Sequence, residues 1–261
     1  MFSSNERYIL RRNQLAEVIC QFRFPDILII SAEEPARFQE AIRSKFPQYH
    51  VRKESVPPKI SGTPGNLQIE NAPNITNYQF SSADGNWRIN LTSNFISLSC
   101  SQYTRWEEFA TMLDEPLAAF IRIYQPAYFS RIGLRYLNFI SRQQLGLEER
   151  TYSELIAPAY LGVLSMNGLD DAQVASSSVD AQVKLDSDSM VKIHAGPGYV
   201  KQRGVTDNTQ RFIFDQDLFM NGNIPIQASA NTLNMLHAQA YPIFRNAILD
   251  PLWQAMDPEA I

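Results

Sequence analysis

Cysteine and histidine are scarce in this sequence, which limits the redox and metal sites that it can build. Its 261 residues include two cysteines and three histidines. Cys20 and Cys100 each lie in an apolar, strand-like run, where a free thiol behaves as a small hydrophobic side chain. The histidines are far apart in the sequence, whereas zinc and iron sites usually need two or more ligands at short spacing. We therefore expect no disulfide framework, no metal site and no cofactor.

Long apolar runs are absent as well. No stretch reaches the roughly 18 apolar residues that a transmembrane helix needs. The first residues, MFSSNERYILRRNQ, are polar and charged where a secretory signal peptide would have its apolar segment. We therefore predict a cytoplasmic protein with no membrane partner.

Positive charge is not in excess. The chain has 23 Lys and Arg against 27 Asp and Glu, which gives a formal net charge of −4. Nonspecific affinity for nucleic acid comes from Lys and Arg that neutralise phosphates, so a general nucleic-acid binder is not expected. A local basic surface remains compatible with this composition.

The common catalytic motifs are also missing. The sequence has no G-x-x-x-x-G-K-[ST] phosphate loop, no G-x-S-x-G nucleophile motif, no H-E-x-x-H, no C-x-x-C and no G-x-G-x-x-G. These absences favour a binding protein over an enzyme, and they leave open an enzyme with an unfamiliar site.

What the sequence does contain is apolar residues in regular patterns. Hydrophobic residues make up 44% of the chain, and they include 15 Phe and 11 Tyr. Residues 15–24 and 129–140 alternate apolar and polar side chains, and this period of two predicts half-buried β-strands. Residues 77–103 show the same period in three shorter runs, with a hairpin turn at Asp84-Gly85, and predict an antiparallel meander.

The remaining elements follow from helical spacing and from turn-forming residues. Apolar stripes predict helices at about 31–46, 104–124, 151–163 and 229–256, and Pro242 should kink the last one. Pro and Gly predict a long surface excursion over 53–75 and a mobile hairpin loop over 195–209. Further strands are expected at about 172–185, 189–195 and 210–219.

This order reads β-α-β-β-β-α twice. We expect an α+β fold in which residues 1–126 and residues 127–261 form two such repeats that share a mainly antiparallel sheet, with the helices on one face. The order is similar to that of a TATA-binding-protein-like saddle or of a helix-grip sheet. The segments around Arg23 and Arg135 match in phase, which favours duplication, and convergence on a common strand pattern is the alternative.

The polar residues that alternate with the apolar ones along each strand, here called the polar phase, are the candidate binding residues. If helices cover one face of the sheet, the polar phase gathers on the other face, which an antiparallel sheet can leave open to a partner. This phase comprises Gln21, Arg23, Arg131, Arg135, Asp180, Gln182, Lys184, Lys192, His194, Arg211 and Asp215. Asp215 and Asp217 lie on the same side of their strand. A planar guanidinium suits the recognition of carboxylates. The alternatives are a solvated face without a partner, and aspartates that bind a cation or pair with nearby arginines.

Two other arrangements involve the last helix. A helix-grip cavity would bind a small apolar or anionic ligand, with Arg135, Tyr136 and His237 at its polar end. An unrecognised metal-dependent hydrolase or nuclease would use Asp215, Asp217 and His237. Each arrangement requires its residues to converge in the fold.

Several motifs resemble those of a sporadically distributed bacterial protein family of unknown function. The resemblance spans nearly the whole chain and implies no catalytic residues; the scattered occurrence of that family resembles that of genes in mobile or defence loci. The motifs are L-x-E-V-x-x-x-x-R-F-P at Leu15 to Pro25, Tyr103-x-x-Trp106-x-x-Phe109, R-I-G-L-R-Y-x-N from Arg131 to Asn138, Asp215-x-Asp217, and Leu236-His237 with Phe244.

We therefore expect a non-enzymatic binding protein that engages a protein partner through its polar sheet face. The resemblance implies that it is the neutralising or sensing member of a mobile defence or toxin–antitoxin-type locus. A homo-oligomer is compatible with the sequence. The candidate binding residues are Arg23, Arg131, Arg135, Tyr136, Asn138, Asp215, Asp217 and His237.

Overall fold

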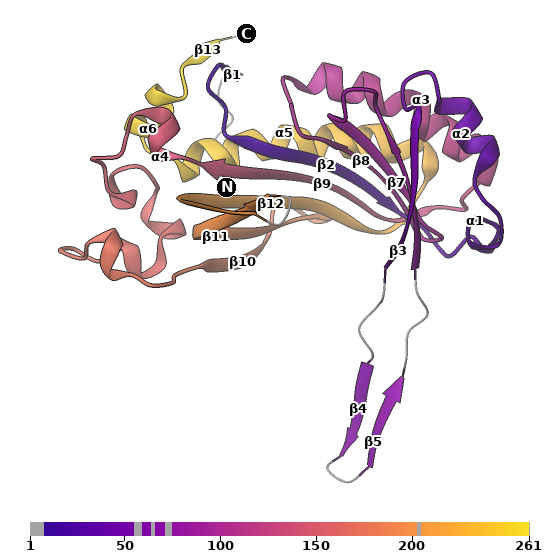
Figure 1. Cartoon of the computed structure of the whole chain (residues 1–261), viewed down its shortest axis with the longest axis horizontal. Helices are drawn as coiled ribbons and strands as arrows, with labels where there is room; N and C mark the ends of the chain where they lie inside the picture. The colour runs from indigo at the N-terminus through magenta and orange to yellow at the C-terminus, as the bar shows by residue number, and fades with distance from the viewer. Residues whose placement is uncertain (1–7, 55–58, 64–65, 71–74, 203–204, 261) are drawn as a thin grey trace.

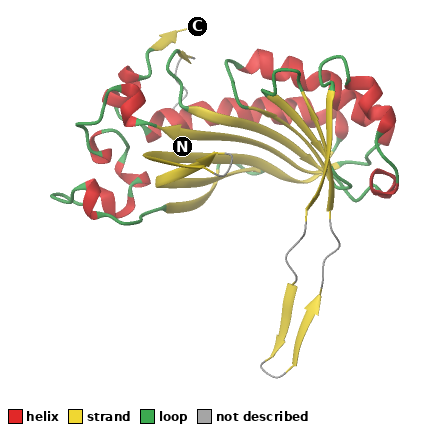
Figure 2. Ribbon diagram, in the orientation of Figure 1, coloured by secondary structure: helices red, strands yellow, loops and turns green. Residues whose placement is uncertain are grey.

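The predicted α+β class is confirmed, because helices pack on a nine-stranded antiparallel sheet (Figures 1 and 2). The computed structural model describes the backbone of residues 8–54, 59–63, 66–70, 75–202 and 205–260. The sheet strands are β2 (Leu15–Arg23), β3 (Gln48–Glu54), β6 (Ile75–Ser81), β7 (Trp87–Leu91), β8 (Phe95–Cys100), β9 (Phe129–Ile140), β10 (Val179–Lys184), β11 (Ser189–Gln202) and β12 (Val205–Ile224).

The strand order places β2 and β9 side by side at the middle of the sheet. The full order is β10-β11-β12-β9-β2-β8-β7-β6-β3. From the central pair outward, β8, β7 and β6 follow β2 on one side, and β12, β11 and β10 follow β9 on the other. One continuous sheet therefore includes strands from both halves of the chain, and β3 is an additional strand at one edge.

The helices cover one face of this sheet. They are α1 (Leu28–Ala32), α2 (Ala36–Ile42), α3 (Trp106–Tyr124), α4 (Arg142–Leu145), α5 (Ser229–Ala247) and α6 (Asp250–Ala255). Phe109 of α3 packs on Trp87 with 5.6 Å between ring centroids, and Phe244 of α5 packs on Phe214 at 6.0 Å. The apolar faces of α3 and α5 thus close the core on the same side of the sheet.

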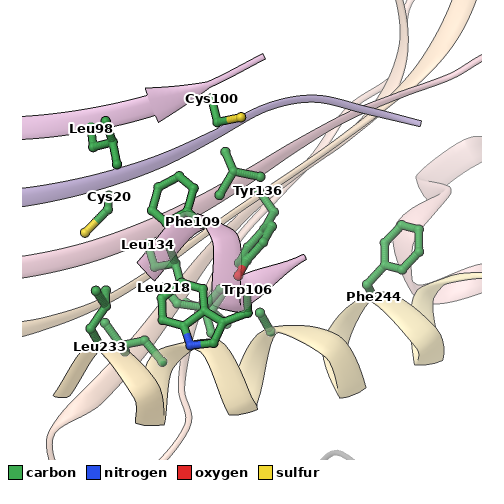
Figure 3. Packing of buried hydrophobic residues seen from close by; sticks show 14 of the residues in the cluster. Cys20, Leu98, Cys100, Trp106, Phe109, Leu134, Tyr136, Leu218, Leu233 and Phe244 are labelled. Atoms are coloured by element: carbon green, nitrogen blue, oxygen red, sulfur yellow. The ribbon is translucent and has the colours of Figure 1, made fainter. Parts of the chain in front are cut away.

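The core contains the apolar phase of the strands. Val18, Cys20 and Phe22 of β2 are buried, as the period of two predicts. Figure 3 shows Cys20, Leu134 and Leu218 from adjacent strands on the side of the sheet that faces α5. The alternation therefore assigns the two faces of the sheet correctly.

The predicted helix over 31–46 is wrong in extent, because the chain forms two short helices. Pro35 precedes α2 as its N-cap residue, and Glu33, after α1, has an extended backbone. Proline disfavours a helical conformation at the residue before it, so one continuous helix cannot cross this position. Ser31 lies inside α1 and does not cap the second helix.

The predicted helix over 151–163 is also wrong. This segment forms three short 3-10 turns, at Tyr152–Glu154, Pro158–Tyr160 and Gly162–Ser165. Pro158 cannot donate a backbone hydrogen bond, and Gly162 has a φ of 55°, which ends a right-handed helix. The strand expected from 172 begins later, at Val179, after a further turn at Asp171–Gln173.

The last predicted helix is divided. The α5 helix ends at Ala247, with Pro242 inside it, and α6 begins at Asp250. Pro251 lies in the first turn of α6, where its missing N–H group costs nothing. Proline at this position would break a helix that continued from α5, so a new helix starts there.

The glycine-rich segment 195–209 does not form the predicted loop. Gly196 and Gly198 of β11 pair with Ile213 and Arg211 of β12, so the two strands continue as a long hairpin. Residues 203–204 lie outside the described residues. A Cβ on Gly196 would lie 2.3 Å from the carbonyl oxygen of Ser177, which explains why glycine occupies this strand position.

The predicted excursion over 53–75 contains an additional hairpin. β4 (Lys59–Thr63) and β5 (Asn66–Glu70) pair with each other in a separate two-stranded sheet. Figure 1 draws this hairpin away from the main sheet. Residues 55–58, 64–65 and 71–74 of the predicted excursion lie outside the described residues.

Segments near the two ends of the chain meet. β1 (Tyr8–Leu10) pairs with β13 (Pro258–Ala260) in a second two-stranded sheet, and Tyr8 packs edge-on against Trp253 at 5.2 Å. In the described part of the chain, no helix is long and apolar enough to cross a membrane.

Candidate functional site

Strand register brings the predicted polar residues together on the sheet face opposite the helices. Gln182, Lys192, Asp217 and Arg135 follow one another across four adjacent strands in a single row. Asp180, His194 and Asp215 form the next row. We call this surface the open face, and it also contains Gln21, Arg23, Arg131, Lys184 and Arg211.

Arg131 and Asp217 form the first ion pair at the centre of the open face. Nη2 of Arg131 donates to both carboxylate oxygens of Asp217 at 2.8 Å. The guanidinium carbon lies 4.7 Å from the ring centroid of Phe219. Gly133, which faces Phe219 across the strands, leaves room for the arginine to lie along β9. The side chain is only 17% exposed, so the pair is partly shielded from water.

Arg135 and Asp215 form the second ion pair. Nε of Arg135 donates to Oδ1 of Asp215 at 2.7 Å, and Nη2 donates to the other carboxylate oxygen. The hydrogen bond from Arg135 and the negative charges of Asp215 and Asp217 outweigh burial and raise the pKa of the guanidinium. The two aspartates therefore pair with arginines, which was one of the two expected alternatives.

Arg23 lies beside these pairs and is exposed. It is directly opposite Arg131 in the strand register. Its Nε donates to Oε1 of Gln21 at 3.0 Å, and Nη1 of Arg131 lies 3.5 Å from the same oxygen. The carbonyl of Gln21 thus reduces the repulsion between two adjacent guanidinium groups. Among the described residues, Arg23 has no carboxylate partner within ion-pair distance.

Among the residues whose side chains the structure describes, cations outnumber carboxylates on the open face. Lys192, Lys184 and Arg88 are exposed there. This excess contrasts with the net charge of −4 of the whole chain. The cations are Arg23, Arg52, Arg88, Arg131, Arg135, Lys184, Lys192 and Arg211, and the carboxylates are Glu17, Asp180, Asp215 and Asp217.

The other three predicted site residues lie on the opposite face of the sheet. Tyr136 and Asn138 belong to the buried phase of β9, and His237 comes from α5. The grouping of Arg135 with Tyr136 and His237 is therefore wrong, because successive strand residues point to opposite faces. The same separation keeps His237 apart from Asp215 and Asp217.

Tyr136, Asn138 and His237 line a cleft with a volume of about 150 Å³ between β1, the start of α3, and α5. The Tyr136 hydroxyl is hydrogen-bonded to Nδ1 of His237 at 2.8 Å. The His237 ring stacks on Trp106 with 4.3 Å between centroids and 8° between planes. Figure 3 shows the Tyr136 hydroxyl directed toward α5, near Trp106.

Gln216 also lines the cleft, although it is not among the predicted site residues. It stands between Asp215 and Asp217 but points to the helix-covered face, where it is 3% exposed. The signal was present, since Gln216 interrupts the apolar phase formed by Phe212, Phe214 and Leu218. A polar residue in a buried phase requires a hydrogen-bond partner.

In the described residues, no group of three or more His, Cys, Asp or Glu side chains is placed to hold a metal ion. Comparison with known proteins adds no further assignment, because no family model and no curated protein sequence matches the chain.

Proposed function

We propose that the protein is a non-enzymatic binding protein whose open face engages a protein partner with an acidic surface. The observation that carries this proposal is the excess of cations among the described side chains of that face, in a chain with net negative charge. Complementary potentials of this kind accelerate association and select among partners.

The two central ion pairs support this role by fixing local charge and shape. Asp215 and Asp217 are compensated by Arg135 and Arg131, so they repel an acidic partner less than free carboxylates would. The exposed cations around them remain available to the partner. Arg23 and Lys192 lie on either side of the pairs, in β2 and β11.

Internal duplication and the genetic setting belong to the same proposal. The symmetrical strand order about β2 and β9 supports an origin by duplication of a β-α-β-β-β-α unit. The resemblance to a sporadically distributed bacterial family supports a cytoplasmic neutralising or sensing role, with a neighbouring gene encoding the partner.

The metal-dependent hydrolase is the less favoured function. Its two carboxylates are bound to arginines, and His237 lies across the sheet from them. A cation at Asp215 and Asp217 would have to displace both guanidinium groups.

Coexpression with the product of each neighbouring gene tests the proposal, followed by calorimetry of any complex. The test uses a triple variant with Arg23→Glu, Arg88→Glu and Lys192→Glu, which reverses three exposed charges and substitutes none of the four residues of the central ion pairs. We expect the affinity to fall by at least about tenfold, with a larger loss at low salt.

The matched control is Arg37→Glu, which reverses one exposed charge on α2, on the helix side of the sheet. It should bind the partner as the wild type does. An unchanged affinity in the triple variant would refute the placement on the open face. Binding of duplex DNA in preference to any neighbouring gene product, with a steep salt dependence, would replace a protein partner with nucleic acid.

A further inference from the structure

The floor of the cleft contains a buried hydrogen-bond acceptor that the described residues leave unpaired. Oε1 of Gln216 is inaccessible to solvent and has no hydrogen-bond partner there. The residue is 3% exposed and lines the cleft beside Tyr136 and Asn138. An unmatched buried acceptor loses the hydrogen bond that it makes with water in the unfolded chain. A donor that enters the cleft would recover this interaction once the amide turns its oxygen toward the cleft.

Two neighbouring polar groups of the floor already make hydrogen bonds. Asn138 Nδ2 donates to the carbonyl oxygen of Phe214 at 3.2 Å, and Tyr136 is bonded to His237. These bonds hold the side chains around Gln216 in place before any ligand arrives. Among the described polar atoms of the floor, Oε1 of Gln216 is the buried acceptor without a partner, and we treat it as the recognition element.

The walls are aromatic and held in place by ring packing. Trp106 stacks on His237, and its Nε1 donates to Oδ1 of Asn234 at 3.1 Å. Tyr103 packs edge-on against Tyr136 at 6.0 Å. Walls of this kind suit a flat apolar body, and a cavity of about 150 Å³ is large enough for a benzene-sized ring.

The charges around the cleft exclude a cationic ligand. No carboxylate lines it among the described residues, and its one formal cation, Arg105, lies on the exposed rim. A buried ammonium group would lack the paired negative charge that it needs. The donor that reaches Gln216 is therefore an uncharged N–H or O–H group.

We propose that this cleft is a binding site for a small uncharged aromatic or heteroaromatic molecule whose N–H or O–H group donates a hydrogen bond to Gln216 Oε1. The ring lies between the aromatic walls, and β1 closes one side with Tyr8, Ile9 and Leu10. This site lies on the face of the sheet opposite the open face, so it is distinct from the partner surface proposed above.

Phenol and toluene are the matched probes, because a hydroxyl and a methyl group have similar size and only the hydroxyl donates a hydrogen bond. NMR titration of the full chain gives the Kd of each probe for the wild type and for Gln216→Leu. We expect phenol to shift the indole N–H resonance of Trp106. The ratio of the toluene Kd to the phenol Kd should fall at least about tenfold in the variant.

Gln182→Leu is the control, since it makes the same chemical change on the open face and should leave the ratio unchanged. Gln216→Met provides a second, unbranched replacement, and it should lower the ratio in the same way. The inference is overturned if phenol does not bind or if it shifts only resonances remote from the cleft. It is also overturned if the ratio of the toluene Kd to the phenol Kd keeps its wild-type value in both Gln216 variants. This experiment and the test of the open face are independent. Whether or not the triple charge-reversal variant loses its acidic partner, the Kd of phenol and the Kd of toluene are each expected to be unchanged.

Discussion

The guanidinium of Arg131 lies over Gly133, in the space that a side chain on Gly133 would occupy. A Cβ there would lie 2.2 Å from Nη1 of Arg131. The absence of a side chain at one position of β9 therefore lets an arginine two residues earlier reach Asp217 on the neighbouring strand.

Gly133→Ala should displace Arg131 and weaken its ion pair. We expect the free energy of unfolding to fall by about 1 kcal/mol, the value of a partly shielded pair, as measured by urea denaturation. In an Arg131→Ala background the same substitution should be neutral or slightly stabilising, because alanine suits a strand better than glycine does. Equal effects in both backgrounds would contradict the steric explanation.

Gln216→Leu should stabilise the ligand-free protein. The substitution replaces an unpaired buried acceptor with an apolar side chain of similar size, so we expect the free energy of unfolding to rise by about 1 kcal/mol. Thermal and urea unfolding of the variant measure this change, and Gln182→Leu at an exposed strand position should show no such gain. Destabilisation by Gln216→Leu would indicate that the wild-type amide is satisfied within the fold.

Asp186 should make stability depend on acid pH. Hydrogen bonds from the Ser189 hydroxyl and from the backbone N–H groups of Asp188 and Ser189 lower the pKa of Asp186 from 3.8 to about 2. Gln239 of α5 also donates to this carboxylate, at 2.8 Å. The ionised form therefore stabilises the fold above about pH 4, and its contribution is lost as the pH falls through about 2.

Comparison with Asp186→Asn isolates this contribution. At neutral pH the variant should be less stable by roughly 1 kcal/mol, because the amide accepts these hydrogen bonds less well. The difference in the free energy of unfolding between this variant and the wild type should vanish as the pH falls to about 2, where Asp186 becomes protonated. Asp188→Asn is the control, and an equal loss there would assign the effect to general surface charge.

The two cysteines should be unreactive in the folded protein. Burial raises the pKa of the Cys20 thiol, and it raises that of Cys100 to about 11. The thiolate is the nucleophile, so at mildly alkaline pH a thiol reagent should label neither residue until the chain unfolds, after which both react. Rapid labelling of the native protein would contradict the burial of the β2–β8 strand pair.

Much of the fold follows from local pattern. The period of two in residues 15–24 assigns Val18, Cys20 and Phe22 to the core, and the structure confirms all three. The helix predicted to reach Tyr124 ends there, with Gln125 in the left-handed region at a φ of 46°. These features succeed because neighbouring residues determine them.

Prediction failed where turn-forming residues or pairing with a distant strand outweighed the local pattern. The apolar spacing of residues 151–163 is helical, yet Pro158 and Gly162 divide the segment into turns. The glycines near 196 indicated a loop, but pairing with residues around 212 holds them in a strand. Hydrogen bonds to a distant strand outweigh the low strand propensity of glycine.

The amino-acid sequence by itself determined which side chains share a face of each strand, because alternation is a local property of extended backbone. It thereby separated Arg131 and Arg135 from Tyr136 and Asn138. Only the tertiary structure decided which groups meet across strands. Arg131 and Asp217 are 86 positions apart, and Tyr136 and His237 are 101 apart. Such contacts depend on strand order and register, which are set by the packing of the whole chain and not by any one segment.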